Sequence, residues 1–260
     1  MPPSNPIVDA PLLAHRGASL YAPENTLQAV ELAAKMGAKW IETDVQVTAD
    51  NELVVIHDLE LERTTNGAGF VALHTLEQIR ALDAGSWFGN KISGYQVPTL
   101  QEFVACIVDN DLNLQLELKE LPGRENDIAD RVCSEIADIW PFERRKLFLS
   151  GFSERCLKRV ARNLPDVPRA IALLCIPEDP DAYAAETGAQ IIHVQDKFVD
   201  EEALRTIRAS SMEFGVATVN DPERAKYLLN SGVTSILTDD PLLLEQDGVE
   251  TRLRALAHQQ

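Results

Sequence analysis

Short apolar runs alternate along the chain with longer stretches in which apolar residues recur every three or four positions. The short runs are rich in Val, Ile and Leu and end at turn-forming residues, which predicts buried β-strands. The longer stretches have the spacing of amphipathic helices, and several begin at Ser, Thr or Asp, which cap helices well. The predicted strands are 11–14, 39–47, 53–56, 113–119, 146–150, 169–175, 189–195, 214–219 and 235–238. The predicted helices are one that opens at 23–26 and stops before Gly37, 76–82, 99–109, 125–139, 153–163, 179–187, 200–210, one that opens at Asp221, and a tail from Pro241.

This alternation predicts an α/β fold with right-handed crossovers between parallel strands. If 39–47 and 53–56 form a hairpin-like pair or one bent unit, about eight strands remain, which predicts a TIM-type (β/α)8 barrel. A doubly wound open sheet is the alternative, but no glycine-rich phosphate loop follows the first strand. A chain of 260 residues has the usual size for one barrel, so we expect a single domain over 1–260.

The regular rhythm breaks between residues 59 and 98. This segment contains several turn signals, one short helical pattern and the aromatic residues Trp87, Phe88 and Tyr95 among others. A long irregular connection inside a compact domain usually has a function. We therefore predict that the segment over about 59–98 is functional rather than a simple connector.

The net charge of −17 argues against nucleic acid or an anionic membrane surface as the partner. No segment is long and apolar enough to predict a membrane span, and Met1 to Asp9 lacks the basic and apolar regions of a signal peptide. The four cysteines are far apart, which favours reduced thiols over zinc or disulfides. These features together predict a cytoplasmic protein.

Acidic residues interrupt two of the predicted strands. Because side chains alternate along a strand, Glu42 and Asp44 share one face of 39–47, and Glu117 and Lys119 share one face of 113–119. Neighbouring ionised carboxylates repel, and a raised pKa or a bound cation relieves the repulsion. The pattern predicts that Glu42, Asp44 and Glu117 form the floor of a metal site.

Two histidines fall at predicted strand ends, where (β/α)8 barrels carry their working residues. His15 and Arg16 follow the first strand, and His57 and Asp58 follow 53–56. One histidine on a strand is more often structural than catalytic, and one Glu-x-Asp pair is a weak signal. Two histidines beside a carboxylate trio are a much stronger one.

The chain resembles the glycerophosphodiester phosphodiesterases, and is nearest to their cytosolic bacterial members. The resemblance covers roughly residues 12 to 241 and rests on motifs in the order and spacing of that family. These are His15-Arg16-Gly17, Pro23-Glu24-Asn25-Thr26, Glu42-x-Asp44, His57-Asp58, Leu61-Glu62-Arg63-Thr64-Thr65-Asn66-Gly67, Asp83-Ala84-Gly85-Ser86-Trp87, Glu117-x-Lys119, Thr218-Val219-Asn220, Gly232-Val233 and Thr238-Asp239.

The resemblance implies a TIM-type barrel with a small inserted subdomain after the second barrel strand, which matches the irregular segment at about 59–98. It also implies metal-dependent hydrolysis of glycerophosphodiesters to sn-glycerol 3-phosphate and an alcohol. The implied roles are metal ligation by Glu42, Asp44 and Glu117, acid–base catalysis by His15 and His57, and phosphate binding by Arg16 and Lys119. Carboxylate ligands favour a hard divalent cation, Mg²⁺ or Ca²⁺, over zinc. The implied partner is a small-molecule substrate, with no nucleic acid and no membrane insertion.

Other assignments stay open. Asp58 could orient His57 or only close a turn, and Asn25 could simply cap or bridge the loop before the first helix. The family commonly has an aromatic residue where this chain has Ala217, so the shape of the pocket wall is open, with Trp87 as the candidate to fill it. The alternatives to a phosphodiesterase are a metal-dependent barrel lyase or aldolase and a non-catalytic barrel that binds glycerophosphodiesters. The head group, the native metal and the oligomeric state, a homo-oligomer included, stay undetermined.

Overall fold

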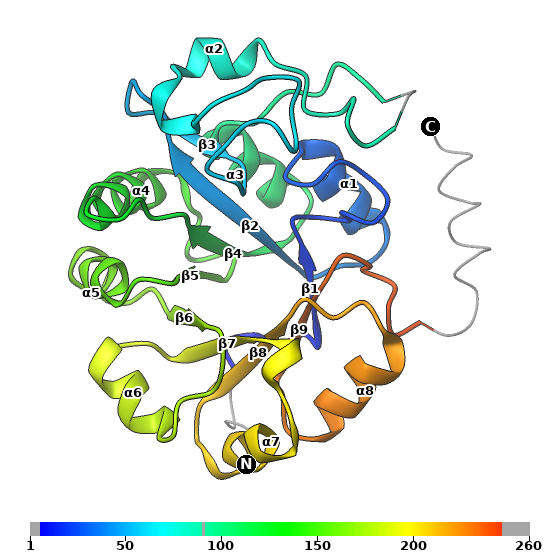
Figure 1. The fold of residues 1–260 in the computed structure, drawn as a ribbon, viewed down its shortest axis with the longest axis vertical. Helices are drawn as coiled ribbons and strands as arrows, with labels where there is room; N and C mark the ends of the chain where they lie inside the picture. Colours follow the sequence, from blue (N-terminus) through cyan, green and yellow to red (C-terminus); the bar gives the residue numbers. More distant parts are fainter. Residues whose placement is uncertain (1–5, 90–91, 246–260) are drawn as a thin grey trace.

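The computed structural model describes residues 6–89 and 92–245. Its centre is a closed barrel of eight parallel strands in which the first strand pairs with the second and the last (Figure 1). The barrel strands are β1 (Leu12–His15), β2 (Trp40–Val47), β4 (Asn113–Leu118), β5 (Leu147–Gly151), β6 (Arg169–Leu173), β7 (Ile191–Gln195), β8 (Glu213–Ala217) and β9 (Ser235–Thr238). The predicted TIM-type barrel is confirmed, and the open-sheet alternative is wrong because β1 closes onto β2.

The hairpin-like pair is also confirmed. β3 (Leu53–Val55) runs antiparallel to β2, with Val45 opposite Val55, and lies outside the barrel. Between β3 and the next long helix the chain forms a 3₁₀ turn, η1 (Val71–Leu73), and a short helix, α2 (Leu76–Arg80). This segment shares a small buried apolar cluster with β3, centred on Val54, Leu61 and Ile79. That it is an inserted subdomain stays a prediction.

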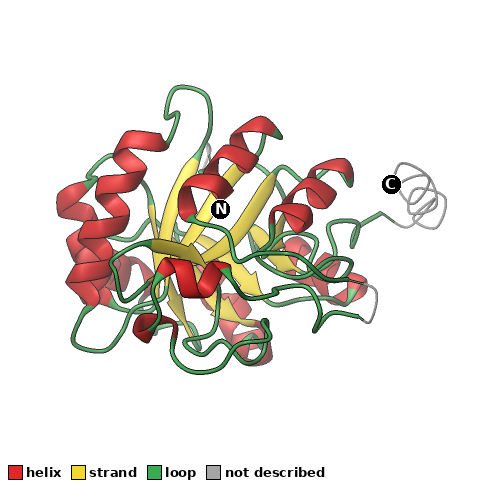
Figure 2. Ribbon diagram, turned by 90° about the horizontal axis from the view of Figure 1, so that it is seen from above, coloured by secondary structure: helices red, strands yellow, loops and turns green. Residues whose placement is uncertain are grey.

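Helices connect consecutive barrel strands and surround the sheet (Figure 2). They are α1 (Leu27–Lys35), α3 (Leu100–Asp109), α4 (Glu125–Ile139), α5 (Glu154–Asn163), α6 (Pro180–Thr187), α7 (Glu201–Ala209), which follows the 3₁₀ turn η2 (Asp196–Phe198), and α8 (Pro222–Asn230). Thr99 and Glu102 form the predicted capping box of α3, and Asp221 caps α8. Each cap satisfies backbone N–H groups that the helix itself leaves unpaired, and so fixes where the helix starts.

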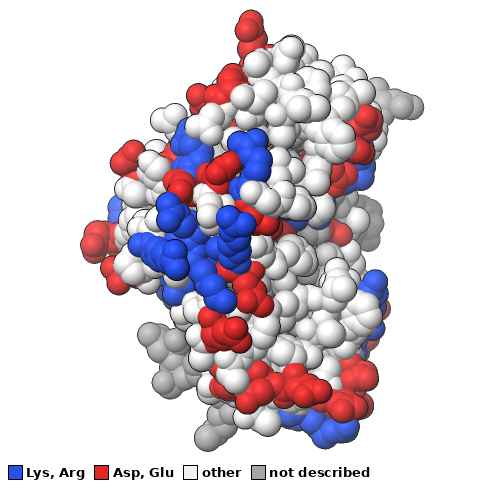
Figure 3. All heavy atoms as spheres, turned by 60° about the vertical axis from the view of Figure 1, so that its left-hand side comes forward, with Lys and Arg blue, Asp and Glu red and all other residues white. Residues whose placement is uncertain are grey.

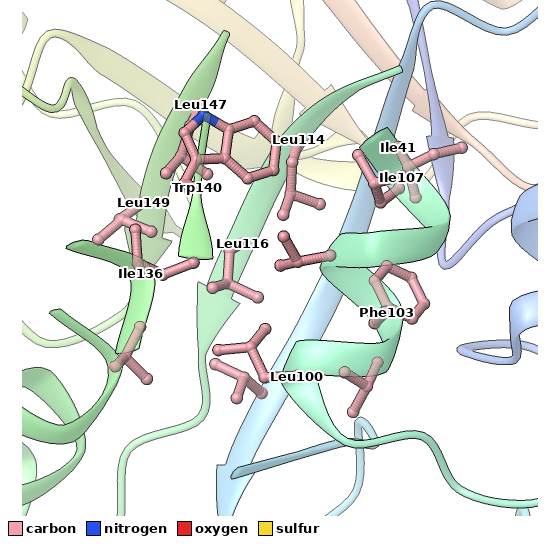
Figure 4. Close-up of a cluster of buried hydrophobic side chains, with 14 of the residues drawn as sticks. Ile41, Leu100, Phe103, Ile107, Leu114, Leu116, Ile136, Trp140, Leu147 and Leu149 are labelled. Atoms are coloured by element: carbon pink, nitrogen blue, oxygen red, sulfur yellow. The ribbon is translucent and has the colours of Figure 1, made fainter. Parts of the chain in front are cut away.

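The main core lies between the barrel wall and the helices. Figure 4 shows apolar side chains of β2, β4 and β5 packed against α3 and α4; Leu114, Leu116 and Phe103 are fully buried there. A second, smaller cluster fills the barrel interior. The framework that holds the barrel mouth is therefore packed on both faces of its strands, as a parallel sheet requires.

The predicted helical tail from Pro241 begins as a turn over 241–244, and its remainder from 246 lies outside the described residues. All four cysteines are described and none is in a disulfide; Cys133 and Cys156 are buried, whereas Cys175 is exposed. Within residues 6–89 and 92–245, no helix has the length and apolarity that crossing a membrane would need.

The acidic net charge is unevenly distributed. Lys and Arg side chains gather on the flank formed by α4 and α5 (Figure 3). Arg155, Lys158, Arg159 and Arg162 line a shallow hollow on this flank. Acidic partners offset much of this charge, as in the pair between Arg159 and Asp130.

Candidate active site

A cleft of about 650 Å³ opens at the carboxyl ends of the barrel strands. All seven predicted site residues line it, although they come from four separate stretches of the chain. They are His15, Arg16, Glu42, Asp44, His57, Glu117 and Lys119. The opposite wall is formed by Phe152, Gln195, Asp196, Lys197, Ala217, Thr218 and Leu237.

The three predicted metal ligands converge at the floor of the cleft. Parallel pairing sets Asp44 beside Glu117, with Glu42 one pleat below on the same face of β2. One carboxylate oxygen from each of Glu42, Asp44 and Glu117 lies within 4.8 Å of the others, and all three side chains are buried. The sequence pattern therefore located this cluster correctly.

The surroundings shift the pKa values of Glu42 and Asp44 in opposite directions. Burial, reinforced by the neighbouring charges of Asp44 and Glu117, raises the pKa of Glu42 well above its usual value. Burial would also raise the pKa of Asp44, but the positive charges of Lys119 and Arg16 overcome it and lower that pKa. Asp44 is therefore the stably ionised member, and Glu42 is the one whose ionisation the cluster opposes.

The two predicted phosphate-binding cations both contact these carboxylates. The Lys119 ammonium lies 3.0 Å from Asp44 Oδ1 and donates to Glu117 as well. Arg16 Nε lies 3.4 Å from Asp44 Oδ2, and Arg16 Nη1 donates to Glu24 Oε1 at 2.7 Å. Both cations are thus held at the cleft floor by acidic side chains.

Asn25 has a more specific position than the sequence suggested. Thr26, not Asn25, caps α1. Asn25 sits in the left-handed region with φ 58° and donates its side-chain amide to Asp44 Oδ2 at 2.9 Å, while Thr43 donates to Asn25 Oδ1 at 2.7 Å. Asparagine tolerates this backbone conformation better than most residues, so the loop can turn the amide toward the buried carboxylate.

The two histidines share one arrangement. His15 Nδ1 lies 2.7 Å from Asp239 Oδ1, and His57 Nδ1 lies 2.6 Å from Asp58 Oδ1. A carboxylate at Nδ1 holds the proton there and leaves Nε2 as the reactive nitrogen. Asp58 thus contacts His57 as an orienting role would require, and that role stays a prediction. Asp239 was missed as the partner of His15, although it directly follows the last barrel strand and that strand pairs with β1.

Burial and hydrogen bonding tune these groups. Burial, together with the nearby Lys119 and Arg16 charges, lowers the pKa of His57 although Asp44 and Asp58 act in the opposite direction. Burial alone would raise the pKa of Asp239, yet its hydrogen bonds with His15, Asn220 and Ser19 lower it to about 2. Both orienting carboxylates therefore stay ionised across the neutral range.

The remaining residues singled out from the sequence lie in different places. His193 is buried below the cleft, inside the barrel, where its Nδ1 lies 3.3 Å from Gln115 Nε2. Gln195 lines the cleft, whereas Trp87 donates to the Ala84 carbonyl and is not a lining residue. None of the described residues among 59–98 lines this cleft, so Trp87 does not fill the wall beside Ala217.

The chain matches the model of the glycerophosphoryl diester phosphodiesterase family over residues 15–243. A glycerophosphodiester phosphodiesterase of Caldanaerobacter subterraneus is 35% identical over 230 residues, which is 88% of this chain and 94% of that protein. One of Bacillus subtilis is 33% identical over 255 residues, covering 90% of this chain and 85% of that protein.

Solved structures agree with these sequence relatives. The phosphodiesterase of Oleispira antarctica, determined in complex with the product sn-glycerol-3-phosphate, superposes with a TM-score of 0.86 at 30% identity and covers 94% of this chain and 97% of its own. A glycerophosphodiester phosphodiesterase of Agrobacterium tumefaciens gives a TM-score of 0.76 at 30% identity, over 90% of this chain and 98% of its own.

Proposed function

The chain belongs to the glycerophosphoryl diester phosphodiesterase family of enzymes, and on that premise we propose how its cleft works. It hydrolyses glycerophosphodiesters to sn-glycerol 3-phosphate and an alcohol, using a divalent cation and a pair of histidines. One observation carries this proposal. Three buried carboxylates and two carboxylate-oriented histidines line the same cleft at the barrel mouth.

The donor set fits a hard divalent cation. Two oxygens on opposite sides of a Ca²⁺ ion are separated by about 4.6–5.2 Å, and the oxygens of Glu42, Asp44 and Glu117 lie within 4.8 Å of one another. With Arg16 and Lys119 as the two contacting cations, three ionised carboxylates would leave one excess negative charge. Besides burial, which is the main cause, the pKa of Glu42 is raised by this excess of negative charge. Mg²⁺ or Ca²⁺ bound by these three residues would offset it and polarise a phosphate oxygen as a Lewis acid.

The histidines move the protons. One neutral imidazole accepts a proton from the attacking nucleophile. This nucleophile is either water or the neighbouring hydroxyl of the glycerol. As the new P–O bond forms, the bond to the alcohol breaks and the other imidazole, protonated, donates its proton to the departing oxygen. Attack by water gives sn-glycerol 3-phosphate directly. Attack by the glycerol hydroxyl gives a cyclic phosphate, which water then opens to sn-glycerol 3-phosphate while the two histidines exchange roles. Asp58 and Asp239 keep the Nδ1 protons in place, so that Nε2 of His57 and His15 exchanges protons with the reacting oxygens.

Arg16 and Lys119 bind the phosphate. Both lie beside the carboxylates, so they bring positive charge to the point where the net-acidic protein would otherwise repel an anionic substrate. The Arg16 guanidinium can pair with two phosphate oxygens, whereas Lys119 acts as a point charge.

The test is the release of sn-glycerol 3-phosphate from glycerophosphocholine by the purified protein, with and without EDTA and after re-addition of Mg²⁺ or Ca²⁺. We expect release that EDTA abolishes and one of the two ions restores. Full activity in excess chelator after prolonged dialysis would exclude the metal. Binding of glycerophosphocholine without any release under all these conditions would favour a non-catalytic barrel.

A further inference from the structure

Arg63 lies between two carboxylates at the edge of the cleft. Its Nε and Nη2 donate to Asp58 at 2.6 and 2.9 Å, and its Nη1 and Nη2 donate to Glu24 at 2.7 and 2.8 Å. The guanidinium thus makes two bidentate pairs at once, which is the strongest geometry available to an arginine. Arg63 itself does not line the cleft.

Each of these carboxylates also holds a residue that does line the cleft. Asp58 Oδ1, which accepts from Arg63, is the atom 2.6 Å from His57 Nδ1. Glu24 Oε1, which accepts from Arg63, also accepts from Arg16 Nη1 at 2.7 Å. One guanidinium therefore fixes the carboxylate behind a histidine and the carboxylate behind an arginine.

The electrostatics make this arrangement depend on Arg63. Glu24 and Asp58 come from different loops, and each would repel the other without the shared cation between them. The hydrogen bond from Arg63 is the largest cause that lowers the pKa of Asp58 to about 2. Without the guanidinium, both carboxylates are free to rotate away from their second partners.

We propose that Arg63 is a positioning residue that sets the orientation of His57 and Arg16 together. The proposal rests on the proposed function, in which His57 transfers a proton and Arg16 binds the phosphate. It also gives the irregular segment after β3 a defined task, because Arg63 links that segment to the loop before α1. A lysine cannot replace Arg63, since an ammonium cannot form two planar bidentate pairs.

The experiment compares Arg63→Ala and Arg63→Lys with a matched control, Arg159→Ala. Arg159 on α5 makes a bidentate pair with Asp130 on α4, and its side chain is 37% exposed, against 42% for Arg63. Both alanine variants therefore remove a partly exposed arginine that pairs with carboxylate in a bidentate way, Arg63 with two partners and Arg159 with one, and only Arg63 lies near the cleft. We expect kcat to fall about 10- to 100-fold and KM to rise in both Arg63 variants, with neither changed in Arg159→Ala.

A second measurement separates positioning from general destabilisation. Guanidinium ion, added far below denaturing concentrations, should enter the half-exposed site in Arg63→Ala and restore part of kcat, with no effect on wild type or Arg63→Lys. In addition, ¹⁵N NMR of the imidazoles should show His57 fixed with its proton at Nδ1 in wild type and in Arg159→Ala, and a mixture of tautomers in Arg63→Ala.

The NMR result decides the inference without any assay of turnover. An unchanged His57 tautomer in Arg63→Ala overturns it, whether or not the enzyme is active. Kinetic constants of Arg63→Ala equal to those of Arg159→Ala also overturn it while leaving the proposed function intact. A shifted tautomer in a protein that never releases sn-glycerol 3-phosphate would support the positioning of His57 and refute the proposed function instead.

Discussion

The two ends of the barrel interior differ sharply although the same strands build both. Toward the amino ends, the interior is filled by Leu13, Trp40, Phe148, Ala170 and Ile191. Toward the carboxyl ends, the inward positions are charged: two residues after Trp40, β2 presents Glu42, and two further on, Asp44. One alternating strand thus packs the core at one end and gathers the carboxylates at the other, as is general for this fold. The apolar end should control stability, and the charged end should control chemistry.

The largest expected effect comes from neutralising the charged end. Glu42→Gln and Asp44→Asn should each abolish turnover, because each removes a proposed metal ligand. In metal-free buffer their stabilities should differ. Glu42→Gln should raise the melting temperature, since burial opposes ionisation of Glu42, whereas Asp44→Asn should lower it, since Asp44 is paired with Lys119 and Arg16. Normal turnover in either variant would remove that residue from the metal site.

The next largest effect on turnover is expected from the two histidines at the carboxyl end of the barrel. His15→Ala and His57→Ala should each lower kcat by about 10²–10⁴ while divalent-ion binding is nearly unchanged, as expected for proton-transfer groups. Steady-state kinetics together with calorimetric titration of the ion measures both quantities. A variant with near-normal kcat would show that its histidine does not transfer a proton.

Substitutions at the apolar end of the barrel should lower stability and leave kcat nearly unchanged. Trp40 is fully buried, its ring lies 5.6 Å from that of Phe148, and its indole donates to Asp9. Trp40→Ala should lower the free energy of unfolding by about 3–5 kcal/mol. Urea denaturation measures this loss, and kcat of the folded fraction should stay near the wild-type value.

Trp87→Ala is the matched control, because Trp87 is 36% exposed and lies outside the cleft. Its loss of stability should be much smaller. If Trp40→Ala reduced kcat as strongly as it reduced stability, the division of labour between the two ends would not hold.

The charged groups at the carboxyl end of the barrel should also make the stability of the protein depend on pH. Asp239 has a pKa of about 2 in the folded protein against an ordinary value of 3.8, so the folded state favours its ionised form. Its contribution is therefore fully present above pH 3.8 and is lost as the pH falls toward 2. Asp239→Asn should cost about 1–2 kcal/mol at pH 6 and almost nothing near pH 2.

The control for this prediction is Leu116→Ala, which removes a fully buried apolar side chain and should have a similar cost at both pH values. Denaturant midpoints at pH 6 and near pH 2, compared with wild type, give the difference. A pH-independent cost of Asp239→Asn would show that its hydrogen bonds to His15 and Asn220 do not depend on its charge.

The fold and the carboxylate cluster could be predicted because both follow from local alternation. Glu42 and Asp44 share a face by the period of a strand, and parallel register then brings Glu117 beside Asp44. The partner of His15 could not be found in this way. His15 and Asp239 are 224 positions apart, and they meet only because β9 closes the barrel onto β1.

Loop and side-chain conformations determine the features of the site that could not be predicted from the sequence. The left-handed backbone at Asn25 turns its amide toward Asp44, and no hydrophobic pattern encodes that turn. The contacts of Lys119 with Asp44 and Glu117 depend on side-chain rotamers, which strand periodicity does not specify. The irregular segment 59–98 was predicted to be functional, but its contact with the site through Arg63 depends on the meeting of two loops, the one after β3 and the one before α1.

The smallest expected effect concerns the shape of the charged end. Ala217 and Thr218 both line the cleft. Because no described residue of 59–98 fills the wall beside Ala217, this cleft should accept bulky alcohol groups. Ala217→Trp should then lower kcat/KM for bulky glycerophosphodiesters about fivefold relative to small ones, near the lower end of the 1–3 kcal/mol typical of one methylene-sized change.

Phe152 provides the matched comparison. It lines the same cleft, and its residue surface is 50% exposed, so Phe152→Ala removes a ring where Ala217→Trp adds one. The ratio of kcat/KM for bulky over small substrates should fall in Ala217→Trp and should not fall in Phe152→Ala, with turnover of the smallest diester little affected by Ala217→Trp. If Ala217→Trp leaves the ratio unchanged, Ala217 does not shape the pocket, and the breadth of the cleft there has no bearing on which alcohols the enzyme releases.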